Sequence, residues 1–137
     1  MVNNKINDTC PDIKIRFQNL ETNALIDTGA IVSCINKKWF EDYKDQIGEY
    51  ESFPLININL ITATGQPSKK LKEIVLVTAE IGIVKFTQQY IIVPHLVKNV
   101  ILGIDTLKLL NAKIDIRNNW ITIDTDITIK NHAEFDF

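Results

Sequence analysis

The residues best suited to carry out chemistry form a short run, Asp27-Thr28-Gly29-Ala30, which directly follows the apolar residues Leu25 and Ile26. Glycine allows the backbone to turn sharply, so the run predicts an aspartate on a loop at the end of a buried strand. Such a carboxylate is a candidate for acid-base chemistry. An ordinary turn aspartate, which accepts hydrogen bonds from nearby amides, would have the same local sequence.

Two further segments follow in an order that resembles the retropepsin family, the aspartic proteases of retroviruses and long terminal repeat retrotransposons. Ile101-Leu102-Gly103-Ile104-Asp105 matches the family's apolar pair before a glycine and a helix. Ala63-Thr64-Gly65 lies where the family has the tip of its flap, and Asn111-Ala112-Lys113-Ile114-Asp115 follows the expected helix. The resemblance extends over about residues 13–129 and is to the family as a whole.

The resemblance implies that Asp27 is the catalytic residue of a homodimer. Peptide hydrolysis by an aspartic protease requires two carboxylates about 3 Å apart that share one proton. The sequence holds no second Asp-Thr-Gly or Asp-Ser-Gly, because Leu107 follows Asp105-Thr106 and Asp126 follows Asp124-Thr125. Two copies of Asp27 would therefore meet at a two-fold axis and activate a water molecule, without metal or organic cofactor.

The resemblance also assigns supporting roles around the catalytic aspartate. Thr28 would bond across the dimer, and Gly29 would let the substrate backbone pass close by. Ala30 replaces the serine of many two-lobed relatives, and the loss of that hydroxyl predicts a less acidic working pH. Ser33 would hydrogen-bond to Asp105 and tie the active loop to the late helix.

Residues beside the loop and in the expected flap are candidates for substrate contacts. Many retroviral relatives carry a charge pair at the positions of Ile31 and Ile104, where an apolar contact is expected here. The turn at 62–67 would close on an extended peptide and exclude water, although a plain hairpin turn explains the same residues. The candidate substrate-binding residues are Ile31, Val32, Thr62, Ala63, Thr64, Gly65, Gln66 and Ile101.

Apolar periodicity predicts the elements that position these loops. Alternation or short apolar runs indicate strands near residues 13–17, 24–26, 56–60, 71–78, 83–93, 99–103, 113–117 and 121–129, with a polar turn over 19–23. Asn36 is the expected cap of a helix over 37–43, and a second short helix is expected over 104–110. Many short strands without strand-helix alternation predict an all-β domain, a retropepsin-like acid protease barrel with its active site at a two-fold dimer interface.

Size and composition narrow the remaining classes. The 137 residues are 45% hydrophobic, which fits one domain, expected over 13–130 between an amino-terminal extension (1–12) and a carboxy-terminal tail (131–137). A formal charge of −2 predicts no nucleic-acid partner and no attraction to an anionic membrane surface. The apolar runs are far shorter than the roughly 18 residues of a membrane span. Two cysteines and two histidines supply too few soft ligands to predict a zinc site.

The sequence therefore predicts an aspartic endopeptidase that cleaves a Gag-Pol-like precursor polyprotein as a homodimer. The competing interpretation is a catalytically silent module of the same fold that dimerises or binds peptide, and the intact Asp27-Thr28-Gly29 favours the enzyme. The amino terminus lacks the apolar core of a secretory signal, so the cytoplasm or a virus-like particle is the expected location.

Overall fold

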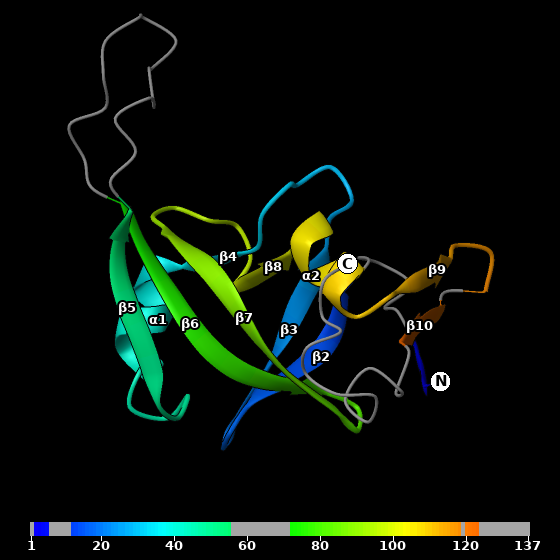
Figure 1. The fold of residues 1–137 in the computed structure, drawn as a ribbon, viewed down its shortest axis with the longest axis horizontal. Coiled ribbons are helices and arrows are strands. Elements are labelled where there is room, and N and C mark those ends of the chain that lie inside the picture. Colours follow the sequence, from blue (N-terminus) through cyan, green and yellow to red (C-terminus); the bar gives the residue numbers. More distant parts are fainter. Residues whose placement is uncertain (1, 6–11, 56–71, 119, 124–137) are drawn as a thin grey trace, which may run out of the picture.

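The computed structural model describes residues 2–5, 12–55, 72–118 and 120–123, and strands dominate them (Figure 1). The strands are β1 (Val2–Lys5), β2 (Asp12–Phe17), β3 (Leu20–Ile26), β4 (Cys34–Asn36), β5 (Tyr50–Leu55), β6 (Lys72–Ile81), β7 (Val84–Val93), β8 (Val100–Leu102), β9 (Lys113–Asp115) and β10 (Trp120–Ile123). The helices are α1 (Lys37–Tyr43) and α2 (Ile104–Leu109). The predicted all-β architecture with short helices is confirmed. No helix in these ranges has the length and apolar character needed to span a membrane.

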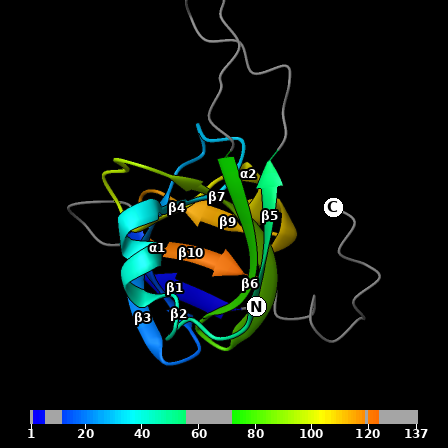
Figure 2. The same cartoon turned by 90° about the vertical axis from the view of Figure 1, so that its left-hand side faces the viewer.

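Six strands close into a barrel in the order β2-β3-β8-β4-β7-β6, and β6 pairs back with β2. Closure occurs where Arg16 of β2 lies opposite Glu80 of β6, and their side chains form an ion pair. Closing a sheet on itself removes its exposed edges. β5 lies outside the ring, on the free edge of β6 (Figures 1 and 2).

The first hairpin is tighter than the sequence predicts. Phe17 pairs with Leu20, which leaves Gln18 and Asn19 as the turn, and Gln18 has a φ of 54°. The prediction of a polar turn over 19–23 is therefore wrong. Residues 20–23 belong to β3, where Glu21 and Asn23 are exposed because an antiparallel pair buries one face and exposes the other. β5 was also not predicted, and the strand predicted over 56–60 lies outside the described residues.

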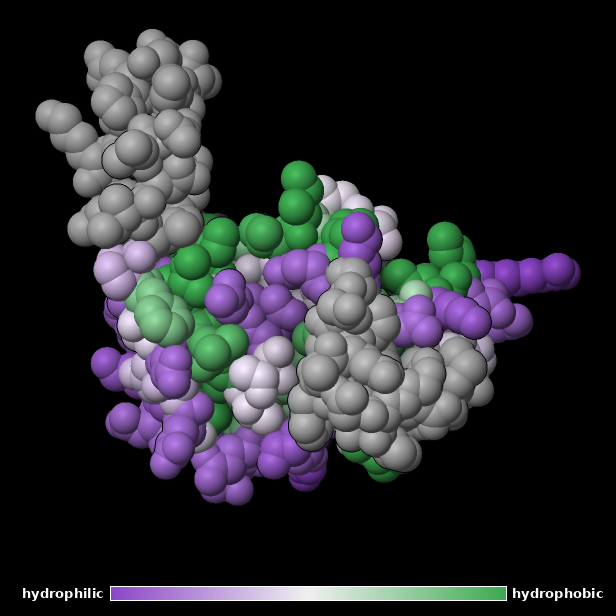
Figure 3. All heavy atoms as spheres, viewed as in Figure 1, coloured by the Kyte–Doolittle hydropathy of each residue, from purple (hydrophilic) through white to green (hydrophobic). Residues whose placement is uncertain are grey.

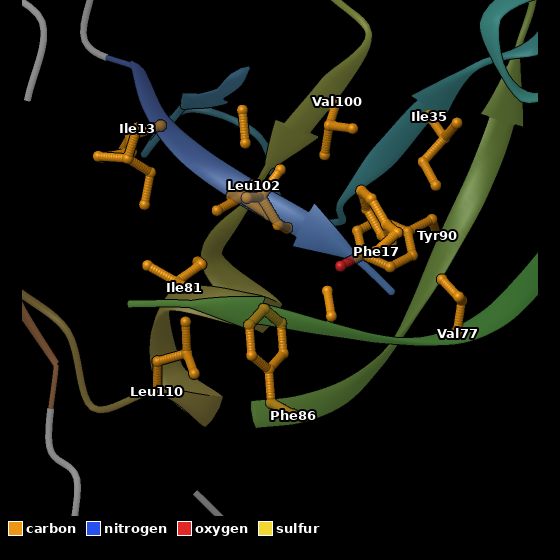
Figure 4. Packing of buried hydrophobic residues seen from close by; sticks show 14 of the residues in the cluster. Ile13, Phe17, Ile35, Val77, Ile81, Phe86, Tyr90, Val100, Leu102 and Leu110 are labelled. Carbon is orange, nitrogen blue, oxygen red and sulfur yellow. The ribbon is translucent and has the colours of Figure 1, made fainter. Parts of the chain in front are cut away.

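The barrel encloses an apolar core to which strands on all sides contribute (Figure 4). Phe17 is fully buried in this core, and its ring centroid lies 5.9 Å from that of Trp39 and 6.0 Å from that of Tyr90. Trp39 belongs to α1, whose predicted N-cap is confirmed because the side chain of Asn36 accepts a hydrogen bond from the Trp39 amide at 3.0 Å. Large apolar side chains thus fill the barrel, and the loops at its ends are anchored to a packed body.

A second sheet, ordered β1-β10-β9, joins two segments from the ends of the described chain (Figure 2). β1 lies within the predicted amino-terminal extension and pairs along its length with β10. Ile121 and Ile123 of β10 are fully buried against the core. The strand predicted over 113–117 ends at Asp115, and residues 116–118 form a turn, whereas residues 124–129 of the predicted last strand are outside the described ranges.

Candidate active site

Asp27 lies where two parallel strands end side by side. Leu25 pairs with Ile101 and Ile26 with Leu102, so β3 and β8 run in the same direction and finish at the same end of the barrel. The Asp27 amide donates a hydrogen bond to the Leu102 carbonyl at 3.0 Å. Parallel pairing thus brings the two predicted motifs, far apart in sequence, into direct contact.

The half-buried carboxylate of Asp27 is oriented by its own turn. Its Oδ1 accepts a hydrogen bond from the Gly29 amide at 2.9 Å, and the Ala30 amide donates to the Asp27 carbonyl at 3.1 Å. A Cβ atom at Gly29 would lie 3.2 Å from that Oδ1, so a larger residue would press on the carboxylate. Thr28 and Gly29 are exposed at the tip of the turn.

The junction of β8 and α2 passes close beneath the active loop, which we define as residues 27–33. A Cβ atom at Gly103 would lie 2.7 Å from the Val32 carbonyl oxygen and 2.8 Å from that of Ala30, so only glycine fits. The Ile104 amide donates to the Ala30 carbonyl at 2.8 Å, and the Asp105 amide donates to the Ile31 carbonyl at 3.2 Å. Consecutive residues of one segment thus hold the backbone of the other.

The predicted hydrogen bond between Ser33 and Asp105 is confirmed. The fully buried Ser33 hydroxyl donates to Asp105 Oδ1 at 2.7 Å, and the Ser33 amide donates to Oδ2 at 3.1 Å. Two residues that the sequence analysis did not assign complete this cluster. Thr106 lies 2.6 Å from the Ser33 hydroxyl, and the Gln88 side-chain amide donates to Asp105 Oδ2 at 3.2 Å.

Alternation along β7 contains the signal that would have identified Gln88. Val84, Phe86, Tyr90 and Ile92 are buried, and Gln88 occupies the inward position between the second and third of them. A polar residue in the apolar phase of a strand needs a hydrogen-bond partner inside the fold. For Gln88 that partner is Asp105.

The predicted substrate-binding residues are placed only in part. Ile31 is 80% exposed and Val32 is 42% exposed, so both apolar side chains are accessible beside Asp27. Ile101 is half-buried in β8. Hydrophobic surface gathers along this end of the barrel in Figure 3. Thr62, Ala63, Thr64, Gly65 and Gln66 lie outside the described residues, and the apolar contact between Ile31 and Ile104 stays a prediction.

Comparison with known proteins agrees with this geometry. Residues 7–115 match the sequence profile of the family described as retroviral aspartyl protease. No match was found among curated protein sequences.

Similar folds occur in solved structures that share little sequence with this chain. One is the retroviral protease-like domain of Ddi1 from Leishmania major, with a TM-score of 0.58, 17% identity, and coverage of 83% of this chain and 86% of that one. A retropepsin-like aspartic protease from Rickettsia conorii has a TM-score of 0.54 and 18% identity, with coverage of 88% of this chain and 87% of that one. EIAV protease complexed with the inhibitor HBY-793 has a TM-score of 0.54 and 17% identity, with coverage of 80% of this chain and 95% of that one. At these identities the likeness is one of fold.

Proposed function

Because the chain belongs to the retroviral aspartyl protease family, we propose that it is an aspartic endopeptidase with Asp27 as its catalytic residue. The observation that carries this proposal is the way the active loop is held. The backbone of Asp27 is fixed by Leu102, while its carboxylate stays partly exposed on a glycine-containing turn. A catalytic group requires this combination of a rigid support and an accessible reactive atom.

Two copies of the chain supply the pair of carboxylates in this proposal. One Asp27 is ionised and removes a proton from a water molecule, whose oxygen attacks the scissile carbonyl carbon. The protonated Asp27 of the other copy gives its proton to the carbonyl oxygen. When the C–N bond breaks, a proton passes from the dyad to the leaving nitrogen, so no covalent enzyme intermediate forms. The exposed tip at Thr28 and Gly29 leaves room for the second copy.

The proposed substrate is an extended segment of a precursor polyprotein of the Gag-Pol type. The exposed side chains of Ile31 and Val32 support a preference for apolar residues beside the cleaved bond. Ala30 places no hydroxyl beside the dyad, which supports a working pH less acidic than that of serine-containing relatives. The cytoplasm or a virus-like particle is the proposed location.

A catalytically silent peptide-binding or dimerisation module is the second candidate. The bond from the Gly29 amide to Asp27 Oδ1 is compatible with this candidate, because an ordinary turn aspartate makes the same contact.

Cleavage of a mixed peptide library separates the two candidates. Wild-type protein is compared with Asp27→Asn, across pH and protein concentration, with and without pepstatin. Asp45→Asn is the matched control, since it makes the same chemical change at an exposed aspartate beyond α1. The enzyme predicts cleavage by wild type and Asp45→Asn, no cleavage by Asp27→Asn or with pepstatin, and specific activity that rises as the dimer forms. A well-folded dimer without cleavage would favour the silent module.

A further inference from the structure

The carboxylate of Asp105 is surrounded by hydrogen-bond donors. Oδ1 accepts from the Ser33 hydroxyl and the Thr106 amide, each at 2.7 Å. Oδ2 accepts from the Ser33 amide at 3.1 Å and the Gln88 side chain at 3.2 Å. An ionised carboxylate only accepts, so four donors match its charged form.

The direction of each hydrogen bond follows from this arrangement. Since the Ser33 hydroxyl donates its single hydrogen to Asp105, it must accept from its other neighbours. Those neighbours are the Gly103 amide at 3.0 Å and the Thr106 hydroxyl at 2.6 Å. Hydrogens in the cluster therefore point toward Asp105, directly or through Ser33.

Gln88 fits the cluster in one orientation only. Its side-chain nitrogen lies 3.2 Å from Asp105 Oδ2 and 3.2 Å from the Gln89 carbonyl oxygen, so both hydrogens of the amide group have an acceptor. The flipped amide would place its oxygen against two acceptors. Gln88 thus provides an uncharged donor from the barrel wall to the acid that holds the active loop.

We propose that Gln88 is a positioning residue for Asp27, acting through Asp105 and Ser33 on the active loop. This inference rests on the proposed function. An uncharged donor at this position helps to fix the active loop without adding charge beside the active site. A carboxylate of the same shape would repel the Asp105 carboxylate.

The surroundings of Asp105 make the site sensitive to a second negative charge. Tyr90, the next inward residue of β7, is fully buried, and burial followed by the nearby charge of Asp105 raises the pKa of its hydroxyl above the ordinary value. It therefore stays neutral. The ion pairs of the described ranges involve Lys14, Arg16, Lys38 and Lys98, and none of them includes Asp105. An added carboxylate would face Asp105, which has no ion-pair partner among the described residues.

The experiment compares Gln88→Glu with Gln89→Glu. Gln89 is exposed on the opposite face of the same strand, so its variant adds the same charge away from Asp105. In Gln88→Glu two carboxylates lie within hydrogen-bond reach, and their repulsion raises one pKa. The protonated form keeps the donor, so the folded loop is supported at low pH and this support is lost as pH rises through the raised pKa.

Peptide cleavage is measured for both variants at temperatures where each remains a folded dimer. For Gln88→Glu, kcat relative to wild type should fall roughly tenfold between about pH 5.5 and about pH 7.5, with KM little changed. Gln89→Glu should follow wild type at every pH. The double variant Gln88→Glu with Asp105→Asn removes the like-charge pair, so its activity should be low but its profile should again parallel wild type.

A Gln88→Glu profile parallel to that of Gln89→Glu would overturn the inference. The chemical shift of the Ser33 amide provides a readout that does not need activity. It should titrate with the raised pKa in Gln88→Glu and not in Gln89→Glu. If wild type shows no Asp27-dependent cleavage, the proposed function fails, whereas the Ser33 titration still decides whether residue 88 acts on the loop.

Discussion

Two aspartates on opposite sides of one hydrogen-bonded unit differ in how fully they are bound. Asp105, at the start of α2, accepts four hydrogen bonds, from Ser33, Thr106 and Gln88. Asp27, on the turn after β3, accepts one side-chain bond from Gly29 within the described ranges. A carboxylate with all acceptor positions occupied has none left for a reacting molecule. We infer from this comparison that Asp105 supports the loop, whereas Asp27 is the group proposed to act on water and substrate.

The backbone between them explains why the two roles remain separate. Gly103 is pressed against the carbonyls of Ala30 and Val32, and the Asp27 amide is bonded to Leu102. Dense contacts fix the position of the loop, while its tip stays exposed. Substitutions in the support should therefore change stability first, and substitutions at the tip should change activity first.

Exchanging each aspartate for asparagine gives the largest expected difference. Asp27→Asn should lower kcat/KM by at least about a thousandfold, since it removes general acid-base catalysis, with the free energy of unfolding near wild type. Asp105→Asn should instead lose about 1–3 kcal/mol of stability, because an amide nitrogen would face two donors. Cleavage assays and urea denaturation on both variants test this. Equal losses of activity at equal stability would break the comparison.

The two glycines of the unit should respond differently to a methyl group. Gly103→Ala should cost up to about 3 kcal/mol of unfolding free energy, because rigid backbone carbonyls cannot yield to the added Cβ. Among the described residues, the methyl group of Gly29→Ala would contact only the Asp27 side chain. This variant should therefore lower kcat while leaving the denaturation midpoint almost unchanged. Denaturation and kinetics on this pair test the claim. A stable Gly103→Ala would show that the junction has more freedom than these distances allow.

Loss of the Ser33 hydroxyl should have the next largest effect. Ser33→Ala leaves the Gly103 amide and the Thr106 hydroxyl without an acceptor in a buried place, which should cost about 2 kcal/mol. Ser52→Ala, at an exposed position of β5, is the control and should be neutral. Thermal and chemical denaturation measure both. If Ser33→Ala is as stable as wild type, the hydrogen bonds of the Ser33 hydroxyl do not stabilise the loop.

Asp115 provides the smallest test, as a third aspartate that is partnered but fully exposed. The side chain and the amide of Asn118 donate to its carboxylate at 2.9 and 3.2 Å, and these bonds lower the pKa of Asp115. Asn118→Ala should bring that pKa back up, as measured by NMR titration. Because the pKa of Asp115 is lower in the folded than in the unfolded protein, these bonds stabilise the fold above the unfolded pKa, and this stabilisation is lost as pH falls through the folded pKa. Any difference in stability between Asn118→Ala and wild type should therefore be seen near neutral pH and vanish in acid. Because Asp115 is fully exposed, this difference in stability should be barely measurable. A large difference would contradict the expectation that exposed hydrogen bonds contribute less to stability than buried ones.

The amino-acid sequence alone determined those elements that are specified by residues close together in the chain. The run from Asp27 to Ala30 carries its turn and its acid within four residues, and Asn36 caps α1 through an amide three positions away. The strand of Ile13, Ile15 and Phe17 follows from alternation. The resemblance added the bond between Ser33 and Asp105, which no local pattern contains.

Only the tertiary structure decided which distant strands pair and what lies between them. Closure of the barrel at Arg16 and Glu80, the parallel pairing of β3 with β8, and the contact of Gln88 with Asp105 each join residues far apart in the chain. The same holds for β1, which pairs with β10. Local periodicity specifies which face of a strand is apolar, whereas the partner is chosen by how all the apolar faces pack together at once.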